Sequence, residues 1–99
     1  MRIPTVRSYG RYQSDAYGAH TLMVDFGRLT LYYSYRTVVA FYSPERGLVC
    51  SKNVWGVTTG KHLNWIQPQH DRRIDRLEFE MQLADTLKRY DLGGQDANL

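Results

Sequence analysis

Residues 29–41, LTLYYSYRTVVAF, are the densest apolar and aromatic stretch of the chain, and they lead through SPERG (43–47) into LVCSKNVW (48–55). A single straight strand over 29–42 would span about 46 Å, which exceeds the width of a domain with a radius of gyration of about 13 Å. The chain must therefore turn within this stretch. Because SYRT is its most polar part, we expect strands near 29–34 and 37–42.

Turn signals on both sides extend these strands into an antiparallel sheet. Proline comes early and glycine late in SPERG, as in a type I turn closed by a glycine with positive φ, so 38–42 should pair with 48–51. Upstream, polarity partly alternates over 19–26, and Gly27-Arg28 is too short for anything except a tight antiparallel connection. A further short strand is expected at 5–9.

The region after the hairpin is predicted to stay extended before the periodicity changes. We interpret 53–59, NVWGVTT, as a strand with a bulge at Gly56, and 61–66, KHLNWI, as a last short extended segment. Residues 71–90 lack glycine and proline and predict a helix that begins at Asp71.

These elements predict an α+β fold with an antiparallel sheet of four to six strands, over about residues 5–66, packed in two layers against one C-terminal helix at about 71–91. One domain would cover 1–92, followed by a flexible tail at 93–99. Since one helix covers one face of a sheet, the other face should be open to solvent or to a partner.

The predicted helix carries two apolar stripes. The first is expected to pack on the sheet: Ile74, Leu77, Met81 and Ala84. The second is either covered by strand edges and the N-terminal arm or forms a homodimer or partner interface: Phe79, Leu83, Leu87 and Tyr90.

Composition and charge narrow the class of protein. The chain is 42% hydrophobic and 23% charged, with eight tyrosines and a net charge of +3, which is ordinary for a folded domain apart from the tyrosines. The basic excess lies in residues 1–69. A single cysteine, Cys50, excludes an internal disulfide and indicates a reducing compartment. With no signal-like or membrane-spanning apolar run, we expect a cytoplasmic protein without membrane contact.

Signals for catalysis or cofactors are weak. His20, His62 and His70 lie in different segments, with no metal-binding spacing around them; His20 and His62 could meet across neighbouring strands as an acid/base pair. Lys61 in TTGKH lacks the spacing of a phosphate-binding P-loop. We therefore expect no catalytic residue, no cofactor and no metal.

Arginines interleaved with tyrosines are the main binding signal. Rings that stack on bases and arginines that bind phosphates are typical of proteins that hold single strands, although tyrosine also serves protein interfaces and simply favours strands. Arg72 and Arg73 in the first helical turn are candidates for phosphate or carboxylate binding, or are solvated charge. The candidate surface comprises Arg7, Tyr9, Arg11, Tyr12, Tyr17, Arg28, Tyr33, Tyr35, Arg36, Lys61, Arg72 and Arg73.

The motifs YGRY, YGAH, YYSYRTVVAF and NVWGVTTGKHLNWI resemble small uncharacterised proteins of phages and mobile elements, over about residues 8–68. The resemblance implies a viral or plasmid origin and no assigned activity. By analogy, we expect a non-enzymatic accessory protein that inhibits or modulates a host nucleoprotein defence complex, as anti-CRISPR proteins do. The alternatives are a direct single-stranded nucleic-acid binder and a small hydrolase or nuclease that uses His20 or His62.

Overall fold

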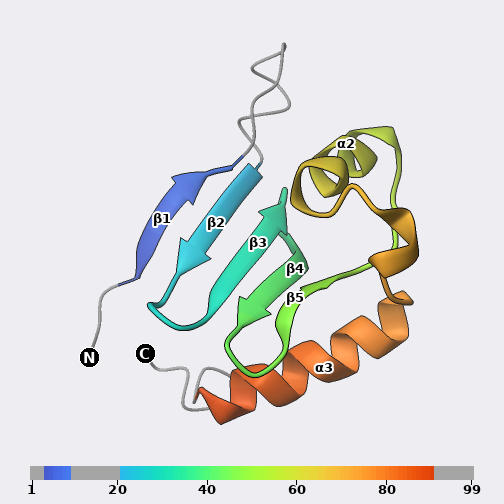
Figure 1. Ribbon diagram of the computed structural model, residues 1–99. Coiled ribbons are helices and arrows are strands. Elements are labelled where there is room, and N and C mark those ends of the chain that lie inside the picture. Colours follow the sequence, from blue (N-terminus) through green and yellow to red (C-terminus); the bar gives the residue numbers. More distant parts are fainter. Residues whose placement is uncertain (1–3, 10–20, 91–99) are drawn as a thin grey trace.

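The computed structural model describes residues 4–9 and 21–90, which form one antiparallel sheet and two α-helices (Figure 1). The sheet has five strands in the order β1-β2-β3-β4-β5. The strands are β1 (Thr5–Ser8), β2 (Thr21–Asp25), β3 (Thr30–Ser34), β4 (Thr37–Ser43) and β5 (Gly47–Cys50). The helices are α2 (Val57–Ile66), the 3-10 turn η1 (His70–Arg72) and α3 (Arg76–Arg89).

The described turns between strands are short and lie where the sequence predicted them. Gly27, with φ 102°, stands in the β2–β3 turn, and Gly47, with φ 70°, closes the β4–β5 turn. Strands β3 and β4 are joined through Tyr35 and Arg36, with Ser34 opposite Thr37. The predicted α+β class, the antiparallel pairing and the C-terminal helix are thus confirmed.

Strand β4 is buried on both of its faces. Phe41 lies opposite Leu31 and Val49, while Ala40 lies opposite Tyr32 and Cys50 on the other side of the sheet. Consecutive side chains of a strand point to opposite faces. The sheet therefore needs an apolar cover on each face.

Helix α3 covers the face of Phe41. Phe79 is fully buried against this face, with its ring centroid 5.6 Å from that of Phe41. Leu83, Leu87 and Tyr90 pack around the same cluster. The second apolar stripe of the sequence is therefore the one that faces the sheet, and it is not available as a dimer surface.

The first stripe was assigned wrongly. Leu77 and Met81 are 72% and 62% exposed, and Ala84 is exposed as well. The helix also begins later than expected, with Asp75 rather than Asp71 as its N-cap residue. Ile74, which precedes the helix, packs on the core and bridges Ser51 of the β5 end.

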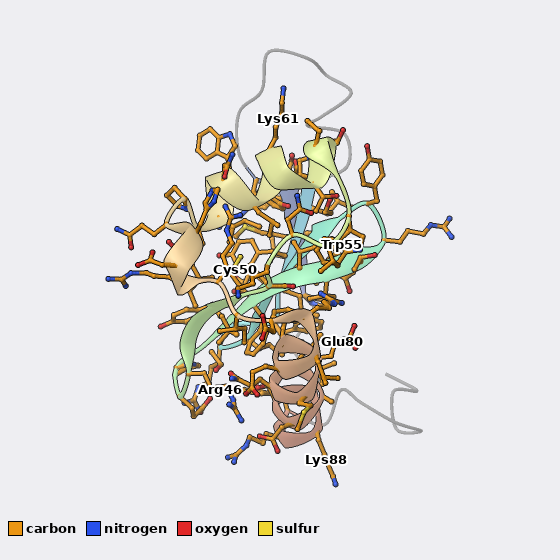
Figure 2. The ribbon with its side chains drawn as sticks, turned by 90° about the vertical axis from the view of Figure 1, so that its right-hand side faces the viewer. Arg46, Cys50, Trp55, Lys61, Glu80 and Lys88 are labelled. Carbon is orange, nitrogen blue, oxygen red and sulfur yellow. The ribbon has the colours of Figure 1, made fainter. Side chains whose placement is uncertain are left out.

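Helix α2 covers the opposite face, so the prediction of extended segments at 53–59 and 61–66 was wrong. Thr59, His62, Leu63 and Ile66 follow the i, i+3, i+4, i+7 spacing of a helix face, and Leu63 packs on Val39, Ala40 and Cys50. Viewed along the sheet, α2 and α3 lie on opposite sides of it (Figure 2). The fold has one helix and one layer more than predicted.

The C-terminal end of α3 is tied to the β4–β5 turn by polar contacts. Arg46 Nη2 donates to Asp85 Oδ2 at 2.6 Å, and Tyr90 Oη donates to Glu45 Oε1 at 2.9 Å. Hydrogen bonds from Arg89 and Arg46 lower the pKa of Asp85, and the bond from Tyr90 lowers that of Glu45. Both carboxylates therefore favour this docking in their ionised form.

Substitutions in α3 distinguish the two stripes. We expect Phe79→Ala to lower the free energy of unfolding by about 3–5 kcal/mol, because it leaves a cavity against Phe41. Leu77→Ala, on the exposed face, should change it by less than about 0.5 kcal/mol. Urea denaturation of both variants gives the comparison, and equal losses would contradict the orientation of α3.

Candidate nucleic-acid interface

Basic residues gather on α2 and the segments that flank it. Residues 51–73 contain Lys52, Lys61, Arg72 and Arg73 against one acidic residue, Asp71. Lys61 is exposed and points away from the sheet (Figure 2). By contrast, acidic side chains of α3 pair with arginines, as in Arg76–Glu80 and Arg89–Asp85. The α2 side is thus the more positive side of the described structure.

A cavity of about 370 Å³ opens between α2, the β5–α2 loop and η1. We name it the Arg73 cavity; its lining comprises Lys52, Asn53, Gly60, Asn64, His70 and Arg73. Two of these side chains are cationic, one is an imidazole and two are amides. Its volume lies in the range of about 300–1,000 Å³ that small-molecule sites occupy.

Arg73 is the least exposed charged side chain of the cavity, at 7%. Its Nε donates to the carbonyl oxygen of Gln67 at 3.0 Å, and its Nη2 donates to Asn64 Oδ1 at 2.8 Å. Within the described residues, no carboxylate forms an ion pair with it. A buried guanidinium held by neutral oxygens leaves a positive charge without a counter-ion.

Backbone pairing places Lys52 beside Arg73. Ile74 N donates to Cys50 O at 2.9 Å, and Lys52 N donates to Ile74 O at 2.7 Å. This short parallel bridge between the end of β5 and the segment before α3 positions the two cations on one rim. The Lys52 ammonium also lies 3.0 Å from Asp75, but both side chains are largely exposed, so this pair is weak.

Side-chain amides complete the rim. Asn53 Oδ1 accepts from the backbone N–H groups of Trp55 and Gly56, which fixes the β5–α2 loop. Asn64 Oδ1 also lies 3.2 Å from His70 Nε2. A Cβ at position 60 would lie 3.0 Å from Asn53 Nδ2, so a larger residue there would require the Asn53 side chain to shift. The cavity wall is therefore built from fixed polar groups.

His62 lies on the buried side of α2, away from solvent. Its Nδ1 is 2.7 Å from Ser34 Oγ, and Ser34 Oγ is 3.0 Å from Thr59 Oγ1. This hydroxyl–imidazole cluster joins α2 to the end of β3. In this position the His62 ring is closed off from solvent and anchors the helix to the sheet.

Cys50 is not placed to act as a nucleophile. It is almost fully buried, and burial raises the pKa of its thiol to about 11 despite the opposing field of Arg73. Because the thiolate is the nucleophile, Cys50 should be inert in the folded protein.

The structure does not gather the predicted surface into one patch. Arg28 lies in the β2–β3 turn and Arg36 in the β3–β4 turn, at opposite ends of β3. Tyr33 packs in the α3 core, and Tyr9 is buried with its hydroxyl donating to the Tyr33 carbonyl at 2.7 Å.

The remaining predicted residues fall into three sets. Arg7, Tyr35, Lys61 and Arg72 are exposed, and Arg73 lines the cavity. Arg11, Tyr12, Tyr17 and His20 lie outside the described residues, as does the predicted tail at 93–99.

The sequence reading missed the other lining residues. The sequence predicts extended segments for Asn53 and Asn64, leaves Gly60 between those segments, and assigns no role to Lys52. The i, i+3, i+4, i+7 spacing of Thr59, His62, Leu63 and Ile66 is the signal that identifies α2 as a helix. In a helix, Gly60 and Asn64 share one face, since they are four residues apart.

Comparison with known proteins gives one finding. Residues 5–81 match the sequence model of DUF8033, a family of unknown function. This chain belongs to DUF8033. The matched range includes every residue that lines the Arg73 cavity of this DUF8033 protein. No match was found among curated proteins or among solved structures.

The described part of this DUF8033 protein has neither a metal-ligand cluster nor a membrane-spanning helix. Across residues 4–9 and 21–90, no cluster of three or more His, Cys, Asp or Glu side chains is arranged to hold a metal ion. In the same ranges, no helix has the length and apolar character needed to cross a membrane.

The Ser34–His62 contact can be tested by a double-mutant cycle. Ser34→Ala should lower the free energy of unfolding by about 1–3 kcal/mol, because it leaves buried polar groups of His62 and Thr59 without this partner. The same substitution in a His62→Phe background should cost less. Chemical denaturation of the four proteins measures the coupling, and additive losses would contradict a direct interaction.

Proposed function

We propose that this DUF8033 protein is a non-enzymatic binding module that holds the phosphates of single-stranded nucleic acid at the Arg73 cavity. The observation that carries the proposal is the buried Arg73 guanidinium, which is bonded to neutral oxygens and forms no ion pair with a described carboxylate. Burial of an uncompensated charge is costly, so an anion in the cavity would be strongly favoured.

Phosphate suits this arrangement better than a single carboxylate does. A guanidinium presents a planar fork of donors that matches phosphate oxygens. Lys52 adds a point charge on the same rim, and His70 adds an imidazole ring to the lining. These groups surround a cavity that opens to solvent, so a phosphate of a longer strand can reach them.

The surroundings favour a polymer over a free phosphate. Lys61 and Arg72 extend the positive charge beyond the cavity, while the Trp55 ring is partly exposed on the same region of the chain. Cations that follow a backbone and rings that stack on bases together bind single strands with little dependence on sequence. The proposal includes no catalytic step, because His62 and Cys50 are buried.

A phage-type inhibitor of a host nucleoprotein complex is a second proposal, and it uses another surface. Leu77 and Met81 form an exposed apolar pair one turn apart on the outer face of α3, which a protein partner could cover. In this case the protein would act in the host cytoplasm and block its target by contact, with or without bound nucleic acid. An origin in a phage or mobile element is part of this proposal.

Binding to an unstructured oligothymidylate tests the first proposal. We expect Arg73→Gln and Lys52→Gln each to weaken binding about tenfold, since each removes a charge-assisted contact. Each should also lower the slope of log Kd against log salt by about 0.7. Titration calorimetry at several salt concentrations measures both quantities.

Two controls make that test decisive. Lys88→Gln also removes one positive charge, but at an exposed position of α3, so it should leave the affinity for the strand nearly unchanged. Protection of the Cys50 thiol from alkylation reports that each variant is folded, because Cys50 is buried behind the cavity. If folded Arg73→Gln and Lys88→Gln lose affinity to the same small extent, the cavity is not the binding site.

A further inference from the structure

A second, smaller cavity lies beside the first, between the β3–β4 turn and the start of α2. Its volume is about 230 Å³. We name it the Tyr35–Trp55 slot; its lining comprises Ser34, Tyr35, Thr37, Val39, Trp55 and Thr59. Asn53 and Gly60 line the Arg73 cavity, so the two cavities share the β5–α2 loop and the first turn of α2.

Two partly exposed rings form the walls of the slot. Tyr35 is 46% exposed and Trp55 is 40% exposed. The Arg76 guanidinium lies over the Trp55 ring, 4.9 Å from its centroid. Arg76 is itself fixed by bonds to Glu80 Oε2 and the Val38 carbonyl. Arg76 therefore steadies the Trp55 indole and is not itself part of the slot lining.

Tyr35 has a left-handed backbone conformation, which glycine and asparagine adopt more easily than tyrosine does. Its φ is 58°, and it is the one described residue other than glycine with positive φ. This conformation costs a residue with a side chain about 1–2 kcal/mol and is more easily adopted by glycine or asparagine. Its ring also lies 5.9 Å from that of His62, so it both covers the buried histidine and walls the slot.

The size and surroundings of the slot select its occupant. At about 230 Å³ it falls below the range of about 300–1,000 Å³ for complete drug-sized ligands, so it suits one flat ring system. Thr37 belongs to its lining, and Arg36 is exposed beside Tyr35 in the chain. A ligand that offers flat rings and negative charge together fits this combination, and a nucleic-acid strand has both.

We infer that the Tyr35–Trp55 slot receives one unpaired nucleobase of the strand whose phosphate lies in the Arg73 cavity; this inference rests on the proposed function. The base stacks on the two rings, and Thr37 supplies a hydrogen bond at its edge. The slot adds affinity for single strands over duplexes, because a paired base cannot enter it.

The test compares an oligothymidylate with an abasic deoxyribose-phosphate strand of equal length, using the full chain and calorimetry. The wild type should bind the thymidine strand about 5- to 150-fold more tightly, which corresponds to stacking of one base at 1–3 kcal/mol. Trp55→Leu should lose this preference and keep its affinity for the abasic strand. Trp65→Leu is the matched control, because Trp65 is exposed on α2 and does not line the slot.

Variants at Tyr35 separate the ring from the backbone. Tyr35→Asn tolerates the positive φ and removes the ring, so it should lose the preference for bases, whereas Tyr35→Phe should keep it. Cys50 protection again reports folding. The assignment of the slot to a nucleobase would be wrong if the wild type bound both strands with equal affinity. It would also be wrong if Trp55→Leu and Trp65→Leu lost the preference for the thymidine strand equally. Failure of the wild type to bind either strand would instead overturn the proposed function.

Discussion

The structure depends on the burial of strand β4 on both of its faces. Val39, Ala40 and Phe41 are consecutive and completely buried. Val39 lies at a bulge and packs with Ala40 under α2, whereas Ala40 and Phe41 point in opposite directions. This run therefore cannot be buried by a cover on one side. Helix α3 supplies Phe79 to one face, and α2 supplies Leu63 to the other.

The candidate site is a consequence of that double cover. To return from α2 on one face to α3 on the other, the chain passes the edge of β5, where Ile74 bridges Ser51. This crossing places Arg73 next to Lys52 and against Asn64 of α2. The cavity therefore forms where the connection between the two helices meets the sheet edge, and its cations come from separate parts of the chain.

The sheet was predictable from sequence because its signals are local. Gly27-Arg28, the polar SYRT and SPERG each fix a turn within a few residues, and the strand ends follow from them. Helix α2 was missed because Val57, Thr58 and Thr59 favour strands and Gly60 weakens a helix. Tertiary burial of Thr59, His62 and Leu63 outweighed these preferences. Residues 38–41, VVAF, are apolar without interruption, and this is the feature of the sequence that indicates burial of β4 on both faces of the sheet.

The site was less predictable because its geometry is not local. The arginine pair at 72–73 was recognised as a phosphate candidate, but the reason given, an unfavourable place at a helix start, was wrong, since α3 begins at Arg76. What distinguishes Arg73 is burial, which depends on how the segment before α3 crosses β5. In α3, the two stripes were equally apolar in sequence, and only packing against Phe41 decides between Phe79 and Leu77.

The account's central claim is that nucleic acid binds on the α2 side, at the Arg73 cavity. The most direct measurement is an NMR titration of the ¹⁵N-labelled full chain with a short oligothymidylate. The account predicts shifts at the Arg73 side chain, the Asn53 and Asn64 amides and the Trp55 indole, with Leu77 and Met81 unaffected. Shifts confined to the outer face of α3, or none at a strand concentration of about 1 mM, above the range of non-specific binding, would contradict it.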